Sequence, residues 1–449
     1  MRTIVGILMM ILFVGANKIY SQNVSTPYEV GTWQGFHKAA ISYTFDDNCP
    51  NQISKVLPMF NQFGYRMTFY TVINWSPNWT ALQGAAAMGH EVGSHTLSHP
   101  SLNTVSVTQQ ISELKTSHDN INAKIPGNQC ITIAYPNCVT SIDTIVSKYY
   151  ISARGCQGFI EGKTPGNFLN VSSLICGNVG AVNTSQDFSQ QLESAVNKNG
   201  WCVFLIHAID DDNGYSPLPS ATLKASLHYI KSATVNKFWV STFSNVSRYI
   251  KERNAASVKE IAKDDTSFTI QVTDTLVDSI FNFPLSIRRP LPKTWPSANV
   301  VQNGKAKDAS IIKIDTMVYL MFDVVPNGGS IVLSESNISV IPIADTIHGI
   351  DTIKDPVVLE INKLNESTPG SINIWLHKST LMFASSELNI QNLSISIFNM
   401  SGILIKNFRN YNITNGIGTV DLSEIKTPGI YIVRLNNGKK SWAKQIVLN

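Results

Sequence analysis

Two hydrophobic patterns alternate along the first half of the chain. Short runs that are apolar at almost every position, such as 39–45 and 201–206, are typical of strands buried on both faces. Between these runs, segments such as 106–125 repeat apolar residues every three or four positions, which predicts amphipathic helices. Strands that alternate with helices indicate a parallel sheet covered by helices. With about seven such units we expect an α/β fold, an irregular (β/α) barrel, in preference to an open doubly wound sheet.

The pattern changes after residue 254. Stretches such as 266–272 and 317–325 alternate apolar and polar residues and are separated by turns, which predicts β-strands. We therefore expect two small all-β domains after the barrel. The predicted boundaries are 1–21 for a signal peptide, 22–254 for the barrel, 255–345 for an all-β accessory domain, 346–369 for a linker and 370–449 for a β-sandwich.

The first 21 residues have the pattern of a signal peptide. Arg2 precedes an apolar run from Ile4 to Ala16, and this run is too short to span a bilayer as a stable helix. We place the cleavage after Ser21. No later stretch is apolar for long enough to form a transmembrane helix. We therefore expect an exported protein, secreted or at the cell surface, that is not an integral membrane protein.

Composition and charge narrow the class further. At 449 residues, 43% hydrophobic and 15% charged, the chain has the composition of a globular protein with two or three domains. The formal net charge of +4 is spread along the chain without a basic run, which argues against a nucleic-acid partner.

All six cysteines lie in the first half of the chain, and none forms a CxxC pair, which argues against a cysteine-ligated zinc. Export permits disulfides. Because a disulfide needs Cα atoms within about 7 Å, a cysteine at the start of a barrel strand cannot pair with one beyond a strand end. The alternative is six free thiols. The favoured pairs are Cys156–Cys176 and Cys49–Cys138, with Cys130–Cys202 as the only pairing open to the two cysteines at strand starts.

Polar residues follow the ends of several predicted barrel strands. In a barrel of parallel strands these ends meet on one face, and that face holds the active site. Each signal alone has an ordinary explanation, such as a surface loop, a turn or a salt bridge. Together they predict one cluster. Its members are Asp46 and Asp47 after the first strand, His95 and His99 after the third, Tyr135 and Asn137 after the fourth, Arg154 on the fifth and His207 after 201–206.

The spacing of the two histidines suggests metal binding. His95 and His99 can bind one ion, and a carboxylate from the Asp46–Asp47 pair can be the third ligand, which leaves an open position, as a catalytic zinc requires. The other carboxylate can then accept a proton from water. His207, from another strand, can protonate a leaving group.

The motifs KAAISYTFDD, GHEVGSHTLSHP, IAYPNC and LIH, taken in this order, resemble those of the polysaccharide deacetylase family, over roughly residues 30–254. The resemblance implies that Asp46 is the catalytic base and His207 the general acid. It also implies that zinc or another divalent ion is bound by three ligands. These are Asp47, His95 and His99.

The same resemblance assigns the remaining candidates. It implies that the backbone N–H of Asn137 stabilises the oxyanion and that Leu205 lines the acetyl pocket, with Tyr135 as a second candidate for substrate binding. The chain also departs from the family pattern. Many members carry an arginine that orients the base where this chain has Ala134, and Arg154 of the next strand is the candidate substitute. Asn137 and Cys138 stand in place of an aromatic residue and a glycine.

The C-terminal segment, which contains ISIFNMSGILIKNF and GIYIVRLNNGKKSWAKQIVLN, resembles the sorting domain of the type IX secretion system. The resemblance implies export by that machinery. The alternative is a generic immunoglobulin-like β-module.

We therefore expect a secreted polysaccharide deacetylase that depends on a divalent metal, with zinc favoured. As a hydrolase of carbon–nitrogen bonds other than peptide bonds, it would release acetate from N-acetyl groups of a chitin-like, peptidoglycan or related amino-sugar polymer. One alternative is an O-acetyl esterase that acts on xylan-like polymers. The other is a non-catalytic carbohydrate-binding surface protein with the same fold.

Overall fold

A computed structural model of the chain describes residues 23–234, 236–336 and 343–344, and seven segments of the C-terminal region. Those segments are 372–377, 380–385, 390–399, 404–413, 417–425, 429–436 and 441–448. The chain forms two compact units, Met1–His348 and Gly349–Asn449. The predicted signal peptide and linker lie outside the described residues. Among the described residues, no helix has the length and apolarity needed to cross a membrane.

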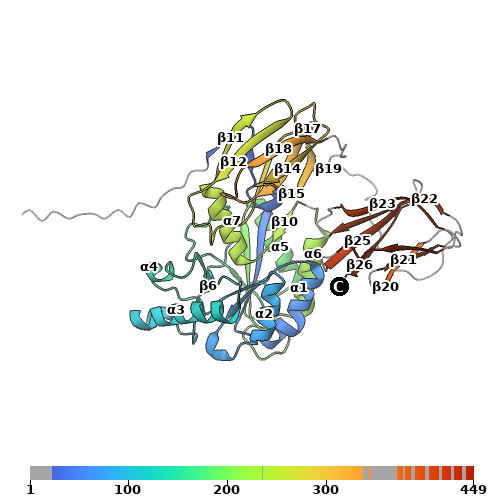
Figure 1. Cartoon of the computed structure of the whole chain (residues 1–449). Helices are drawn as coiled ribbons and strands as arrows, with labels where there is room; N and C mark the ends of the chain where they lie inside the picture. Colours follow the sequence, from blue (N-terminus) through green and yellow to red (C-terminus); the bar gives the residue numbers. More distant parts are fainter. Residues whose placement is uncertain are drawn as a thin grey trace, which may run out of the picture. The chain divides into compact units, whose positions relative to one another are not determined.

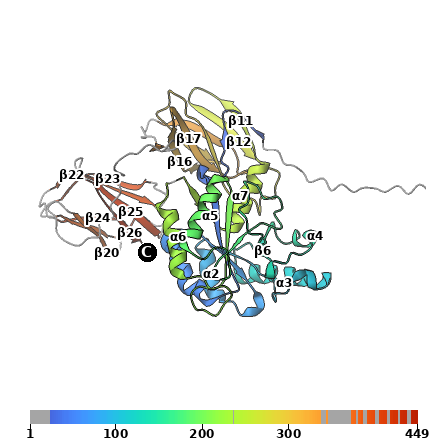
Figure 2. The same ribbon diagram turned by 180° about the vertical axis from the view of Figure 1, so that it is seen from behind.

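The first unit contains a curled sheet of parallel strands in the order β7-β6-β5-β4-β3-β9-β8, and β10 pairs with the first part of β3. Helices surround these strands in both views (Figures 1 and 2). The strands are β3 (Ala39–Asp46), β4 (Thr68–Thr71), β5 (Glu91–Ser94), β6 (Thr132–Ala134), β7 (Ser152–Arg154), β8 (Leu174–Ile175), β9 (Trp201–Ile206) and β10 (Phe238–Val240). The helices are α1 (Leu57–Phe63), α2 (Trp79–Ala87), α3 (Val107–Lys124), α4 (Asp143–Val146), α5 (Ser185–Asn197), α6 (Ser220–Ser232) and α7 (Phe243–Ala255).

The segment before β8 joins the two ends of this sheet. Val171 N donates to the carbonyl of Ala153 and Gly155 N donates to the carbonyl of Val171, each at 2.8 Å. The chain then continues into β8, which pairs with β9. The predicted irregular barrel is confirmed. Five short helical turns lie in its connections: η1 (Gln34–Phe36), η2 (Gln52–Val56), η3 (Ile73–Trp75), η4 (Leu102–Thr104) and η5 (Pro136–Cys138).

Strand alternation decides which side chains face the barrel interior. On β3, Ile41, Tyr43 and Phe45 pack in the core shared with the helices. Ala40 belongs to a second buried cluster, together with Trp201 of β9. Because successive side chains point to opposite faces, the inward row of β3 ends at Asp46.

The rest of the first unit is all-β. A six-stranded sheet, β1-β11-β12-β18-β14-β15, and a five-stranded sheet, β19-β16-β17-β13-β2, enclose one apolar core. Two segments of the chain form these sheets, because β1 and β2 come before the barrel and the other strands come after it. The dark blue N-terminal strand lies beside β11 in Figure 1. The strands are β1 (Asn23–Val24), β2 (Glu29–Val30), β11 (Ser257–Lys263), β12 (Ser267–Thr273), β13 (Leu285–Pro290), β14 (Ser297–Gln302), β15 (Lys305–Lys307), β16 (Ala309–Ile314), β17 (Met317–Val324), β18 (Ile331–Ser336) and β19 (Ile343–Ala344).

The second unit, within its described residues, contains two antiparallel sheets, β20-β21-β24 and β23-β22-β25-β26. Apolar side chains from both sheets form one core, as in a β-sandwich. The strands are β20 (Ile372–His377), β21 (Thr380–Ser385), β22 (Ile390–Asn399), β23 (Leu404–Ile413), β24 (Ile417–Asp421), β25 (Gly429–Asn436) and β26 (Ser441–Leu448).

The cysteine pairing differs from the expected one. Cys138 and Cys156 form a disulfide, with Cα atoms 5.7 Å apart. They follow the paired strands β6 and β7, so strand adjacency brings them together. The favoured pairs Cys156–Cys176 and Cys49–Cys138 are wrong, and Cys130–Cys202 does not form. The disulfide does join two cysteines at the same end of the barrel. The other four are buried free thiols, Cys49, Cys130, Cys176 and Cys202.

Candidate metal-dependent active site

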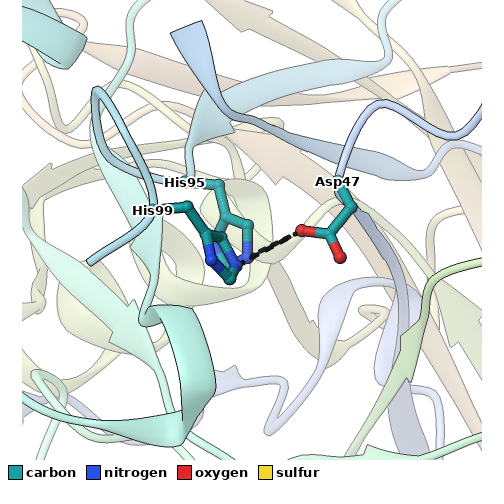
Figure 3. A group of neighbouring side chains, drawn as sticks. All are labelled: Asp47, His95 and His99. Atoms are coloured by element: carbon teal, nitrogen blue, oxygen red, sulfur yellow. Dashed lines mark ion pairs between the residues drawn. The ribbon is translucent and has the colours of Figure 1, made fainter. Parts of the chain in front are cut away.

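Three side chains from the ends of β3 and β5 converge on one point. One ligand atom from each of Asp47, His95 and His99 lies within 4.8 Å of those from the other two. Asp47 Oδ1 is 3.4 Å from His95 Nε2 and 3.5 Å from His99 Nε2, and Figure 3 shows both imidazoles pointing at this carboxylate. The structure thus brings together the three predicted metal ligands.

The donor set fits a divalent cation. His95 Nδ1 donates to the carbonyl of Ala134 at 2.9 Å, which leaves Nε2 with a free lone pair directed at Asp47. Asp47 Oδ1 is buried and accepts no hydrogen bond from any described residue. Burial raises the pKa of Asp47, but the neighbouring imidazoles outweigh this effect and hold that pKa below its ordinary value. A carboxylate with two imidazoles is a common ligand set for catalytic zinc.

The loop that carries the histidines has a strained backbone. Thr96 has φ of 67° and His99 has φ of 66°, and a non-glycine residue in this region costs about 1–3 kcal/mol. The carboxylate of Glu113 on α3 accepts hydrogen bonds from Leu97 N at 3.0 Å and Ser98 N at 2.8 Å. Glu113 is 4% exposed and holds the loop in place. Sequence reasoning missed it, although a glutamate on the buried face of an amphipathic helix is an unusual feature.

Asp46 has a different partner from Asp47. Arg154 Nη2 donates to Asp46 Oδ2, and the two side chains are 1% and 2% exposed. Arg154 on β7 pairs in register with Ala134 on β6. Ala134 stands at the position where many family members carry an arginine, so here the guanidinium comes from the neighbouring strand. Asp46 Oδ1 is buried without a hydrogen-bond partner among the described residues.

His207 lies just beyond β9 and faces both carboxylates. Its Nε2 is 3.9 Å from Asp46 Oδ2 and 3.9 Å from Asp47 Oδ2. Burial lowers the pKa of His207. The ring also contacts that of Tyr215, with centroids 4.9 Å apart.

The other three predicted site residues are Asn137, Leu205 and Tyr135, and each has its own surroundings. Asn137 lies in η5 with φ of 53°, and its Nδ2 donates to Ser101 Oγ at 3.2 Å. Leu205 is buried and is two residues before His207, on the inward row of β9. Tyr135 packs in the core shared with the helices, and its hydroxyl donates to the carbonyl of Leu169. Because Ala134 points inward, alternation turns Tyr135 outward, toward the core shared with the helices.

Two segments of the chain match family models. Residues 34–149 match the model described as Polysaccharide deacetylase, and residues 377–449 match the model described as Secretion system C-terminal sorting domain. The chain therefore carries a domain of the polysaccharide deacetylase family and a C-terminal sorting domain, which confirms both resemblances. The first match ends before Arg154, Leu205 and His207, whose placement rests on the geometry described above.

Relatives and solved structures share part of the chain. A gellan lyase from Bacillus sp is 27% identical over 324 residues, which are 68% of this chain and 13% of that protein, so this chain spans a small part of its relative. The Xyl-CE4 domain of a multidomain xylanase from the hindgut metagenome of Trinervitermes trinervoides is 19% identical, over 46% of this chain and 89% of that one, with a TM-score of 0.34. A peptidoglycan deacetylase from Bacillus subtilis is 17% identical, over 48% and 92%, with a TM-score of 0.32.

Proposed function

We propose that this protein is an exported, metal-dependent polysaccharide deacetylase that removes N-acetyl groups from an amino-sugar polymer such as chitin or peptidoglycan. One observation carries the proposal. At the carboxyl ends of the barrel strands, the three ligand side chains lie beside a carboxylate paired with an arginine and beside a buried histidine. The sorting domain supports export, and we propose that the type IX secretion machinery recognises it.

Each residue has a proposed part in the hydrolysis. A divalent cation held by Asp47, His95 and His99, most simply Zn²⁺, would polarise the acetyl carbonyl and lower the pKa of a nearby water. Asp46 accepts a proton as the water oxygen attacks the carbonyl carbon, and the Arg154 guanidinium keeps this carboxylate oriented.

Groups that follow other strands stabilise the oxyanion and protonate the leaving group. The backbone N–H of Asn137 donates to the developing oxyanion. His207 donates its proton to the sugar nitrogen as the carbon–nitrogen bond breaks, so that acetate and a free amine leave. The lowered pKa of His207 makes its protonated form a stronger acid. Leu205, on the same inward row, would contact the acetyl methyl group.

Exposed aromatic rings beside the site favour a glycan as substrate. Trp75 is 46% exposed, and its ring centroid is 4.7 Å from that of the ligand His99. Tyr215 is 51% exposed and lies against His207. These rings follow β4 and β9, the two strands that flank β3. Aromatic faces on both sides of Asp46 and Asp47 would support successive sugar rings of a polymer.

One observation favours a second candidate, an O-acetyl esterase on xylan-like polymers. His207 Nδ1 is buried and has no hydrogen-bond partner among the described residues, so no carboxylate accepts a hydrogen bond from this nitrogen. An alcohol needs less protonation to leave than an amine does. This arrangement would therefore serve an ester more easily than an amide.

Release of acetate from defined substrates tests the proposal. The purified protein, loaded with Zn²⁺, is incubated with chitooligosaccharides, peptidoglycan and acetylxylan, with Asp46→Asn as the matched control. Acetate from the first two supports the N-deacetylase, and acetate from acetylxylan alone supports the esterase. Binding of a glycan without acetate from any substrate would show a non-catalytic carbohydrate-binding protein.

A further inference from the structure

The disulfide joins two turns that carry two of the proposed active-site groups. Cys138 directly follows Asn137, whose N–H is the proposed oxyanion donor, and Cys156 comes two residues after Arg154, which holds Asp46. The connection therefore spans the turn after β6 and the turn after β7. Its meaning for catalysis rests on the function proposed above.

Backbone pairing between these two strands stops just before the disulfide. The last bond of the ladder is the one that Tyr135 N donates to the carbonyl of Arg154 at 3.1 Å. Beyond it, Gly155 turns to the other side, where its N–H donates to Val171 and its carbonyl accepts from Ser173 Oγ. The disulfide is the next connection between the β6 turn and the β7 turn.

The β6 turn has a backbone that non-glycine residues adopt at a cost. Asn137 has φ of 53° and Cys138 has φ of 61°, so two successive residues are left-handed. Two backbone hydrogen bonds hold the turn from within, from Cys138 N to Tyr135 O at 3.3 Å and from Val139 N to Pro136 O at 3.0 Å. Glycine would adopt this conformation without strain.

We infer that the Cys138–Cys156 disulfide is a positioning element of the active site. It holds the left-handed turn that presents the Asn137 N–H, and it fixes this turn against the strand that presents Arg154 to Asp46. The three metal ligands come from the ends of β3 and β5, outside the two strands that it joins. Its loss should therefore reduce turnover and leave metal binding intact.

Two double variants separate a positioning role from simple stabilisation. Cys138→Ala/Cys156→Ala removes the disulfide and leaves a strained turn. Cys138→Gly/Cys156→Ala removes the same disulfide but allows the turn to keep its shape. The matched control is Cys130→Ala, which removes a buried free thiol. For each protein we would measure kcat and KM on the best acetylated substrate, metal content, the thermal midpoint, and amide exchange at 137–139.

We expect the alanine variant to lose kcat by about tenfold to a hundredfold, because a misplaced oxyanion donor costs on that order. Its metal content should stay stoichiometric and amide exchange at 137–139 should rise. The glycine variant should recover several-fold in kcat, although both double variants melt at a similar lower temperature. Cys130→Ala should match the wild type.

Several results would overturn the inference. These are wild-type kcat in the alanine variant, an equal loss in both double variants, or metal loss that parallels the loss of kcat. The disulfide itself is checked by tryptic mapping of unreduced Cys130→Ala protein, in which Cys138 is the one cysteine of peptide 125–148. This peptide must be linked to peptide 155–163, which contains Cys156. If the disulfide is present and amide exchange at 137–139 rises in the alanine variant, but the wild type is inactive, the result counts against the proposed function.

Discussion

At the scale of single residues, two adjacent aspartates serve one site from different backbone conformations. Asp46 is the last residue of β3 and points into the barrel, where Arg154 contacts it. Its neighbour would point to the opposite face if the strand continued. Asp47 instead has φ of 72°, and this left-handed turn directs its carboxylate back to His95 and His99. The strained backbone therefore gives the two carboxylates separate partners.

This division predicts that metal binding and activity can be separated. His95→Ala or His99→Ala should lose both stoichiometric metal and activity, because two remaining ligands bind a cation weakly. Asp46→Asn should keep its metal and lose activity by about a hundredfold or more, because the amide cannot accept the proton. Metal analysis by mass spectrometry, beside an acetate assay, checks both. Full activity in Asp46→Asn would contradict the assignment of the base.

The register of β6 and β7 predicts that an arginine at position 134 can replace Arg154 as the partner of Asp46. Arg154→Ala should lower kcat by about tenfold to a hundredfold with metal retained, because Asp46 loses its buried partner. Since Ala134 pairs in register with Arg154, the double variant Ala134→Arg/Arg154→Ala should regain part of that kcat. A double variant that is folded, holds metal and is no more active than Arg154→Ala would refute the idea that orientation of Asp46 is what Arg154 supplies.

At the scale of elements, α3 contributes to the candidate metal site through Glu113. The glutamate lies on the buried side of the helix, and its carboxylate receives the N–H groups of the strained loop between the two histidines. The helix thereby determines where His99 lies, although none of its residues is a candidate ligand.

Replacing Glu113 should lower the metal affinity of the site, although Glu113 is not itself a candidate ligand. Glu113→Gln keeps the size of the side chain but loses the charge that binds two backbone N–H groups, so the His99 loop should loosen. We expect metal affinity to fall by about tenfold to a hundredfold, the scale found for groups that orient ligands. Asp119→Asn, at an exposed position on the same helix, is the matched control. Competition with a chromogenic chelator measures both affinities, and equal values would contradict the role of Glu113.

Elements with a clear hydrophobic period were predictable, and contacts that depend on strand order were not. The apolar runs of β3 and β9 identified the barrel, and the polar residues at strand ends identified the cluster that could hold a metal ion. The two-residue strands β1 and β2 are too short to show any alternation. The disulfide was missed because Cys156 was paired with Cys176, from which no full strand–helix unit separates it, and not with Cys138 beyond the end of the neighbouring strand. Tyr135, one residue beyond β6, continues the alternation of the strand and packs on its outer side.

At the scale of the whole molecule, the barrel and the middle β-sheets form one compact unit and the sorting domain lies in another. Strands β1 and β2 tie the chain before the barrel to β11 and β13 after it. Tyr249 of α7 adds a contact, donating from its hydroxyl to the carbonyl of Gly31. The domain boundary predicted at residue 254 therefore crosses a region of continuous packing.

This organisation predicts different outcomes for two truncations. Residues 23–348 should fold and keep the full kcat of the purified protein, because every candidate catalytic group lies within the first unit. Residues 32–254 should aggregate or melt at a much lower temperature, because they lack the strands on either side. Circular dichroism melts and the acetate assay compare them. In cells, removal of 370–449 should stop surface delivery, and a stable, active 32–254 fragment would show that the β-sheets are dispensable.

The pairing of the first strand with a late one also sets the order in which the chain can fold. Asn23 and Val24 pair with Ser257 and Val258, so β1 must wait until the entire barrel and the start of β11 are present. Contacts between residues so distant in sequence are slow to form. A chain synthesised only as far as the barrel therefore lacks the partner of its first strand, and this sheet cannot be completed until synthesis has passed Val258.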